Sequence, residues 1–202
     1  MAKFVKSTWF KCITVLLVIS VISGGLLAAL NDLLFVSSEE RTARAVAKIY
    51  GEEITVTEDD IILDTASADP EKSSPIEYDF GRIDKIYRVN EDYLFQTVGF
   101  QGYKNGTVTL WIRVVPNSGA ANIDKVILET YSKQTLMSKF GETYFSEFKL
   151  TDITENYKNG NFFSPDGGVN SNPNTGATLS ATACCNAVNC VIKYIGENLD
   201  EN

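Results

Sequence analysis

The stretch TVTLWIRVV, residues 107–115, decides the class of fold. Apolar side chains occupy every second position, at Val108, Leu110, Ile112 and Val114. This period of two places them on one face of a β-strand. The same criteria predict three more strands, at residues 83–89, 93–100 and 123–131. Asn105-Gly106, just before the quoted stretch, favours a tight hairpin turn, because such turns need positive φ at both central residues.

Helices are predicted before and after these strands in the sequence, over residues 37–50, 136–149 and 179–196. Ser37 or Ser38 can cap the first helix, and two glutamates follow in its first turn. The second helix carries four aromatic side chains whose helical spacing is typical of a core face: Phe140, Tyr144, Phe145 and Phe148. Polar loops are predicted at residues 64–78 and 156–175. Together these elements predict an α+β domain, in which helices pack on an antiparallel sheet.

An N-terminal segment has the length and composition of a membrane span. No residue from Cys12 to Leu30 is charged, and the apolar character continues to Val36. About 20 apolar residues are needed to cross a bilayer core. Lysines precede the segment and acidic residues follow it, so the positive-inside rule predicts a cytoplasmic N-terminus and an extracytoplasmic body. A cleaved signal peptide is the alternative, although its apolar core is usually shorter and its cleavage site richer in small residues.

These features divide the chain into four parts. Residues 1–11 are expected to form a cytoplasmic N-terminus and residues 12–36 a single transmembrane helix in the cell membrane. Residues 37–80 are expected to form a connecting helix and loop, and residues 81–202 the folded domain.

Composition excludes several classes of function. The chain contains no histidine, which rules out His-based triads and His metal ligands. Its net charge is −8, and three lysines before the apolar segment leave the remainder at −11, so nucleic acid is not an expected partner. Cys-x-x-Cys pairs are absent, so no metal site is predicted, and Cys184, Cys185 and Cys190 are expected to be buried as small apolar side chains.

The most informative segment is SNPNTGATLSAT, residues 171–182. A polar loop ends there in Thr175-Gly176-Ala177-Thr178 and continues into an apolar helix. Such a junction presents unpaired backbone N–H groups and the positive end of a helix dipole, and its small residues leave room for a ligand. It therefore suits a phosphate. The alternative is an ordinary helix start, in which Thr178 caps the helix and Gly176 makes the turn.

Thr175-Gly176-Ala177-Thr178, followed by Leu179-Ser180, resembles the signature of the FMN-binding domain family. This domain occurs in the G component of Rnf ion-translocating electron-transport complexes and in the related C component of sodium-pumping NADH:quinone reductases. Gly102-Tyr103 and Gly106, with the strand that follows, resemble that family's glycine-tyrosine turn, and residues 123–129 resemble its next strand. The resemblance covers most of the chain and implies that residues 81–202 are an FMN-binding domain.

The resemblance also implies particular residue roles. The last Thr of the family motif is esterified to the FMN phosphate, and Thr178 is the matching residue here. Further contacts to the cofactor are implied for Thr175, Gly176, Ala177, Leu179 and Ser180, with Thr135 and Leu136 near the flavin ring. The implied function is that of an electron-carrier subunit, rather than a stand-alone catalyst, in an ion-translocating redox complex. Its partners would be the other membrane subunits and the flavin transferase that loads the cofactor.

Two positions depart from the family pattern. The transferase usually favours Asp three residues before the motif, where this chain has Asn172. The family's Glu-Thr-Pro-Gly-aliphatic-Gly loop corresponds to QTLMSK, residues 134–139, in which only Thr135 matches. Non-covalent FMN therefore stays open. So do two other functions: an anchored extracytoplasmic binding or assembly domain without flavin, and a flavoprotein of an extracellular electron-export chain.

Overall fold

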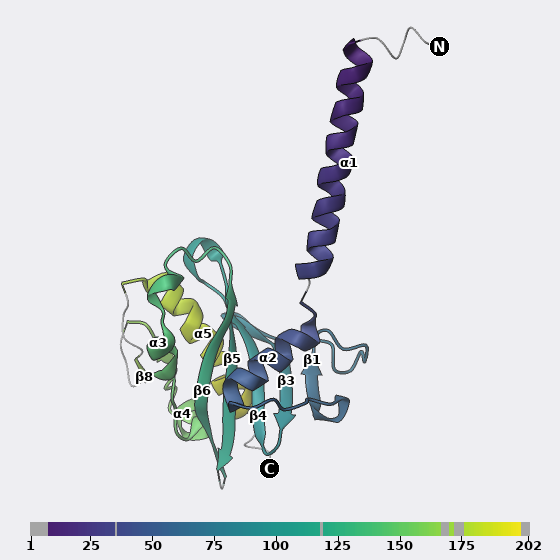
Figure 1. The fold of residues 1–202 in the computed structure, drawn as a ribbon. Coiled ribbons are helices and arrows are strands. Elements are labelled where there is room, and N and C mark those ends of the chain that lie inside the picture. The colour runs from purple at the N-terminus through teal and green to yellow at the C-terminus, as the bar shows by residue number, and fades with distance from the viewer. Residues whose placement is uncertain (1–7, 35, 118, 167–169, 172–175, 199–202) are drawn as a thin grey trace. The chain divides into compact units, whose positions relative to one another are not determined.

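The computed structural model describes residues 8–34, 36–117, 119–166, 170–171 and 176–198 (Figure 1). The chain divides into two units, residues 1–41 and residues 42–202. The described part is an α+β structure, with an N-terminal apolar helix followed by an antiparallel sheet that helices cover. This confirms the predicted class of fold.

Helix α1, Thr8–Leu34, contains the apolar segment. Within it the stretch Trp9–Asn31 is long and apolar enough to cross a membrane, and its side chains are exposed. At 1.5 Å per residue, roughly 20 residues match the hydrocarbon core of a bilayer. The structure thus shows one N-terminal helix that can serve as a membrane span or a signal anchor.

Helix α2, Ser38–Tyr50, confirms the predicted connecting helix. The Ser37 hydroxyl accepts a hydrogen bond from the Glu40 backbone N–H at 3.1 Å, as a helix cap does. Ala45, Val46 and Ile49 form its buried face, at helical spacing. Amphipathic spacing therefore fixes which side of α2 packs on the sheet.

The sheet has six strands, and all of its pairings are antiparallel. The four predicted strands are confirmed as β3 (Gly81–Val89), β4 (Asp92–Gly99), β5 (Val108–Asn117) and β6 (Ala120–Tyr131). Two short strands that the sequence did not predict, β1 (Ile61–Asp64) and β2 (Ile76–Tyr78), both pair with β3. The main order is β1-β3-β4-β5-β6, which leaves β6 at one edge.

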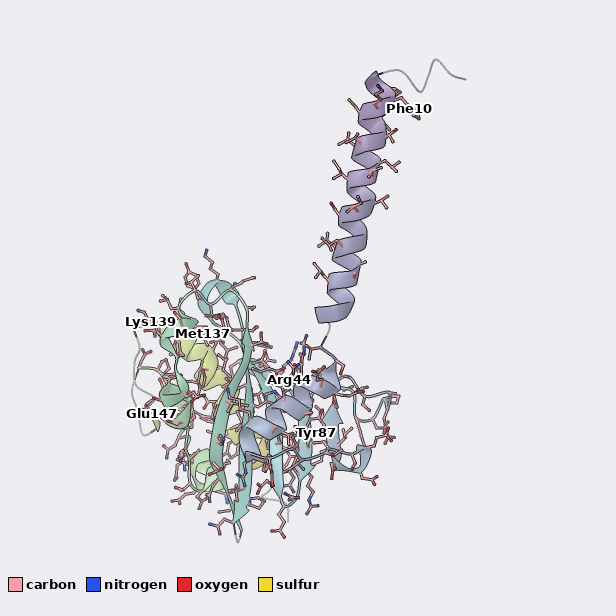
Figure 2. The ribbon with its side chains drawn as sticks, viewed as in Figure 1. Phe10, Arg44, Tyr87, Met137, Lys139 and Glu147 are labelled. Atoms are coloured by element: carbon pink, nitrogen blue, oxygen red, sulfur yellow. The ribbon has the colours of Figure 1, made fainter. Side chains whose placement is uncertain are left out.

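Helices α2 and α5 (Thr178–Asn198) cover opposite faces of this sheet (Figure 1). Neighbouring residues of one strand therefore enter different cores. On β5, Ile112 packs in the larger core with α5, and Trp111 packs in the smaller core with α2. Tyr87, which is labelled in Figure 2, stacks on Trp111 with ring centroids 6.1 Å apart.

Helix α5 confirms the predicted C-terminal helix and is buried on most of its sides. It approaches the sheet closely at Gly99, where a Cβ atom would overlap the carbonyl oxygen of Ala183. Asn189 pins the preceding segment: its side chain accepts from Phe163 N at 2.8 Å and donates to Phe163 O at 3.0 Å. That segment contains α4 (Ile153–Lys158), β7 (Phe163–Ser164) and β8 (Asn170–Ser171).

The predicted helix over residues 136–149 is wrong in extent. The structure has a 3₁₀ turn, η3 (Met137–Lys139), and a short helix, α3 (Glu142–Ser146). Gly141 lies between them in extended conformation and breaks the helix. The aromatic side chains are nevertheless buried in the core as expected, with edge-to-face contacts around Tyr144. Burial of large rings, not helix periodicity, explains their spacing.

The predicted two-residue turn at Asn105-Gly106 is also wrong. The connection from β4 to β5 is longer and contains the 3₁₀ turn η2, Tyr103–Asn105. Lys104 and Asn105 take the positive φ values, 51° and 55°, while Gly106 is extended. Gly106 lies against Ser132 and Gln134, and this close approach explains the glycine.

The contact at Gly99 predicts a specific loss of stability. In Gly99→Ala the new methyl group meets the Ala183 carbonyl, so α5 must shift, and we expect the free energy of unfolding to fall by about 1–3 kcal/mol. Chemical denaturation of the full chain in detergent micelles measures this. At Gly141 a Cβ meets nothing within 4 Å, so Gly141→Ala should change stability by less than about 0.5 kcal/mol. Equal losses in both variants would contradict the packing argument.

Candidate functional site

The candidate site lies where α5 begins. Gly176 has φ +72°, is exposed, and would have open space around a Cβ atom. Ala177 is buried, and its carbonyl accepts from Ala181 N at 3.0 Å. Ala177 is therefore the capping residue by position, and Thr178 is the first residue inside the helix.

Thr178 is half-buried, and its hydroxyl makes no hydrogen bond to another described residue. The backbone N–H groups of Thr178, Leu179 and Ser180 likewise have no acceptor among the described residues, as the first turn of a helix requires. The ordinary helix start considered above differs from this geometry, since Thr178 stands one position too late to cap α5. Among the described residues, its hydroxyl and the three neighbouring N–H donors therefore have no partner.

Gln134, at the start of the segment that follows β6, joins this helix end to two other parts of the chain. Its Oε1 accepts from Ser180 Oγ at 2.7 Å and from Tyr103 N at 3.1 Å. Its Nε2 donates to Ser132 O at 3.1 Å. The Gln134 side chain is buried, and its bond to Ser180 is shielded from water, whereas the bonds to Tyr103 and Ser132 are partly buried. The amide thereby holds α5, the β4–β5 connection and the end of β6 together.

Most of the predicted site residues share this end of the domain. Thr135 and Leu136 follow Gln134 directly and are exposed, and Leu179 precedes Ser180 and is 52% exposed. Tyr131, three residues before Gln134, is a further exposed apolar side chain. Figure 2 shows Met137 and Lys139 on the side of the domain where α5 begins. The structure thus brings together segments about 45 residues apart, as the Ser180–Gln134 bond shows directly.

The predicted residues differ in what they face. Ala177 and Ser180 are buried, and the Ser180 hydroxyl is occupied by Gln134, so both contribute to the frame of the site. Gly176, Thr178 and Leu179 are at least partly exposed. Thr175 and Asn172 lie outside the described residues. The sequence did not single out Gln134 as a buried contact, and no local pattern distinguishes it.

The three cysteines of α5 are buried free thiols. Burial raises the pKa of Cys185 and of Cys190 to about 12, and it raises the pKa of Cys184 further. A thiol with so high a pKa is protonated at neutral pH and a poor nucleophile. The expectation that these cysteines act as small apolar side chains is confirmed.

A second polar cluster lies on the α2 face of the sheet. Asp64 accepts from Tyr87 Oη and from Lys85 Nζ, the latter at 3.2 Å. Lys85 Nζ also lies 3.5 Å from Thr42 Oγ1 on α2. All four side chains are buried. Burial is the larger cause that raises the pKa of Tyr87, and the hydrogen bond to Asp64 raises it as well. The cluster ties α2 to β1 and β3, and sequence reasoning missed it because β1 was not predicted.

Two hollows in the described structure are lined by residues outside the start of α5. One, of about 580 Å³, lies beside the bridge between Ile123 and Leu150. The other, of about 700 Å³, runs between β6 and α3. Neither includes Thr178 or its neighbours, so the exposed junction at α5 is a surface site and not the wall of one of these cavities.

Comparisons with protein-family models, curated proteins and solved structures find no match to this chain. The likeness to FMN-binding domains therefore depends on the residues quoted above.

The role of Gln134 is testable. In Gln134→Leu, the buried Ser180 Oγ loses its acceptor, and Tyr103 N and Ser132 O lose partly buried hydrogen bonds. Because a buried group left unpaired costs roughly 1–3 kcal/mol, we expect the free energy of unfolding to fall by about 1–3 kcal/mol. Thr135→Ala is the control: Thr135 is exposed and adjacent, and its loss should cost less than about 0.5 kcal/mol. Similar stabilities for the two variants would show that Gln134 does not hold the junction.

Proposed function

We propose that this chain is a membrane-anchored flavoprotein subunit that carries FMN on Thr178 and relays electrons in an ion-translocating membrane redox complex of the Rnf kind. The observation that carries the proposal is the position of Thr178. Its hydroxyl is unbonded within the described chain, at the first position of α5, with unpaired N–H groups beside it and open space at Gly176. A phosphoester needs a free hydroxyl and gains from those donors.

The convergence of distant segments supports the same assignment. The resemblance singled out three segments by sequence alone: the turn near Gly102, the loop from Gln134 and the motif ending at Thr178. Gln134 bonds to Tyr103 and Ser180, so all three meet in one place. A cofactor that contacts all of them would need that proximity.

The exposed apolar side chains suit the flavin ring. Four large apolar side chains are exposed among the described residues of the body: Ile62, Tyr131, Leu136 and Leu179. Three of these, Tyr131, Leu136 and Leu179, lie within three residues of Gln134 or Ser180 in the chain. Apolar surface of this kind is stabilised when a planar ring covers it. Bound FMN supplies one-electron redox chemistry, while this chain positions it and sets its access to solvent.

Helix α1 supplies the membrane attachment in this proposal. Lysines lie before its apolar stretch and acidic residues after it, so the body would face the extracytoplasmic side. A covalent tether is useful there, because FMN that dissociates outside the cell is lost. The partners would be polytopic subunits of the complex, with a flavin transferase needed for loading.

Loss of one hydroxyl tests the attachment. The natively expressed protein should give a band that fluoresces under ultraviolet light after denaturing electrophoresis, and Thr178→Val should abolish it. Thr182→Val is the matched control, because Thr182 lies one turn further along α5 and its hydroxyl only donates to Thr178 O at 2.9 Å. This variant should keep the fluorescence. A dark wild-type band from cells that contain the transferase, or a fluorescent Thr178→Val band, would contradict the ester.

Two further measurements separate the alternatives. Visible absorbance at the flavin bands in the undenatured protein, with a dark denatured band, would identify non-covalent FMN. Absence of flavin absorbance would favour a binding or assembly domain. Co-purification with polytopic subunits distinguishes the Rnf-like complex from an extracellular electron-export chain.

A further inference from the structure

Strand β6 lies at one edge of the sheet. It pairs with β5, and on its other side the described chain bonds to its backbone at the bridge between Ile123 and Leu150 (N–H···O distances 2.8 and 3.3 Å). Register shifts interrupt the β5–β6 pairing on both sides of the stretch Lys125–Leu128, which is itself regular. Unpaired N–H and C=O groups on a regular edge are a template for another strand.

The hollow of about 700 Å³ follows this edge. Five consecutive β6 residues, 124–128, line it on one side, and α3 with the turn before it lines the other. Its volume falls in the usual range of ligand-binding clefts, roughly 300–1,000 Å³. A run of consecutive strand residues along a groove is the arrangement into which an extended peptide fits by strand addition.

The two flanks of the groove differ in chemistry. Val126 packs in the α5 core together with Phe140 and Phe145, which also line the groove. Lys125 faces the α2 side, where its Nζ donates to Lys48 O and Ile49 O, both at 3.0 Å. Side chains of an added strand would point alternately to these two sides. One set would meet apolar surface and the other would meet lysines.

The charge of the groove indicates the sign of its occupant. Lys48, Lys125 and Lys149 line it, together with Asp124 and Glu142. Arg113 Nη1 already binds Asp124 at 3.3 Å, whereas neither Lys48 nor Lys149 forms an ion pair with a described residue. The groove therefore carries a positive surplus in a chain whose net charge is −8. An acidic segment is complementary to it.

We propose that this groove binds an extended segment of a partner protein, added to the edge of β6, in which apolar and acidic residues alternate. Lysines and register shifts also serve to guard free edges. A guarded edge, however, needs no hollow with buried aromatic side chains beside it. The proposal stands apart from the flavin assignment, because none of the groove residues belongs to the α5 junction.

A synthetic peptide tests the groove directly. The probe is a fluorescein-labelled peptide of eight residues that alternates Val and Glu, and its control has the same composition arranged as four Val followed by four Glu. Binding to the full chain in detergent micelles is followed by fluorescence anisotropy, and hydrogen–deuterium exchange reports the site. We expect the alternating peptide to bind at least tenfold more tightly than its control and to slow exchange in residues 125–128 at least threefold.

Paired variants separate the groove from general effects. Gly141→Phe fills the groove, because Gly141 lines it and has nothing within 4 Å of a Cβ atom. Thr143→Phe adds the same ring to an exposed α3 position that does not line the groove. Lys48→Glu with Lys149→Glu reverses the charge, and Arg88→Glu does so at an exposed site on β3. We expect at least tenfold weaker binding in the first member of each pair and less than twofold change in the second.

Three outcomes would overturn the proposal. Equal binding of the two peptides would show that the alternation of Val and Glu does not matter, which contradicts strand addition. Binding unaffected by Gly141→Phe would show that the peptide binds outside the groove. Sedimentation that shows the chain dimerising through residues 125–128 would assign the edge to a second copy of this chain instead of a partner.

Discussion

The close contact between α5 and the sheet constrains everything else in the domain. A Cβ atom at Gly99 would lie 1.8 Å from the Ala183 carbonyl oxygen, and one at Gly81 would lie 2.7 Å from the Cys190 sulfur. These two glycines therefore let one side of the helix lie directly against β3 and β4. A helix seated at two such points has little freedom to slide or turn. The position of its first residue, Thr178, is therefore fixed by contacts made further along the helix. The residues after β6 contact the start of the helix through the bond between Ser180 and Gln134.

Gln134 bonds the start of α5 to the end of β6. Its contacts give a physical reason why this position holds Gln and not the Glu of the FMN-binding family pattern that the sequence resembles. The side chain both accepts, from Tyr103 and Ser180, and donates, to Ser132 O. An ionised carboxylate only accepts hydrogen bonds, so Glu at this position would face the Ser132 carbonyl without a proton to give. The amide is thus matched to this backbone. The segment keeps a buried polar anchor although the Pro and Gly residues of the family loop are absent.

Sequence reasoning succeeded where apolar side chains recur at a regular spacing along one face of an element. Alternation identified β5 and an apolar face at helical spacing identified α5, because burial imposes a period. Helix α2 was identified by its serine cap and the two glutamates of its first turn. Sequence reasoning failed for residues 136–149, where aromatic burial imitated helical spacing and Gly141 interrupted the helix. It also missed β2, whose three residues are too short for a period. The bond from Ser180 to Gln134 could not be predicted, because it depends on the tertiary path of 46 residues.

The segment after β6 links the two proposed activities. Its first residues, from Gln134, adjoin the junction at Thr178, and its later residues, from Phe140 to Lys149, line the groove beside β6. An electron carrier can exchange electrons only with a partner that docks close to its cofactor. A groove built on the same short segment as the proposed attachment site would therefore suit a carrier better than a groove on a distant face. The buried ring contacts of Tyr144 with Phe140, Phe145 and Phe148 hold this segment in a fixed shape, so the proposed docking site and the proposed cofactor site would share one rigid support.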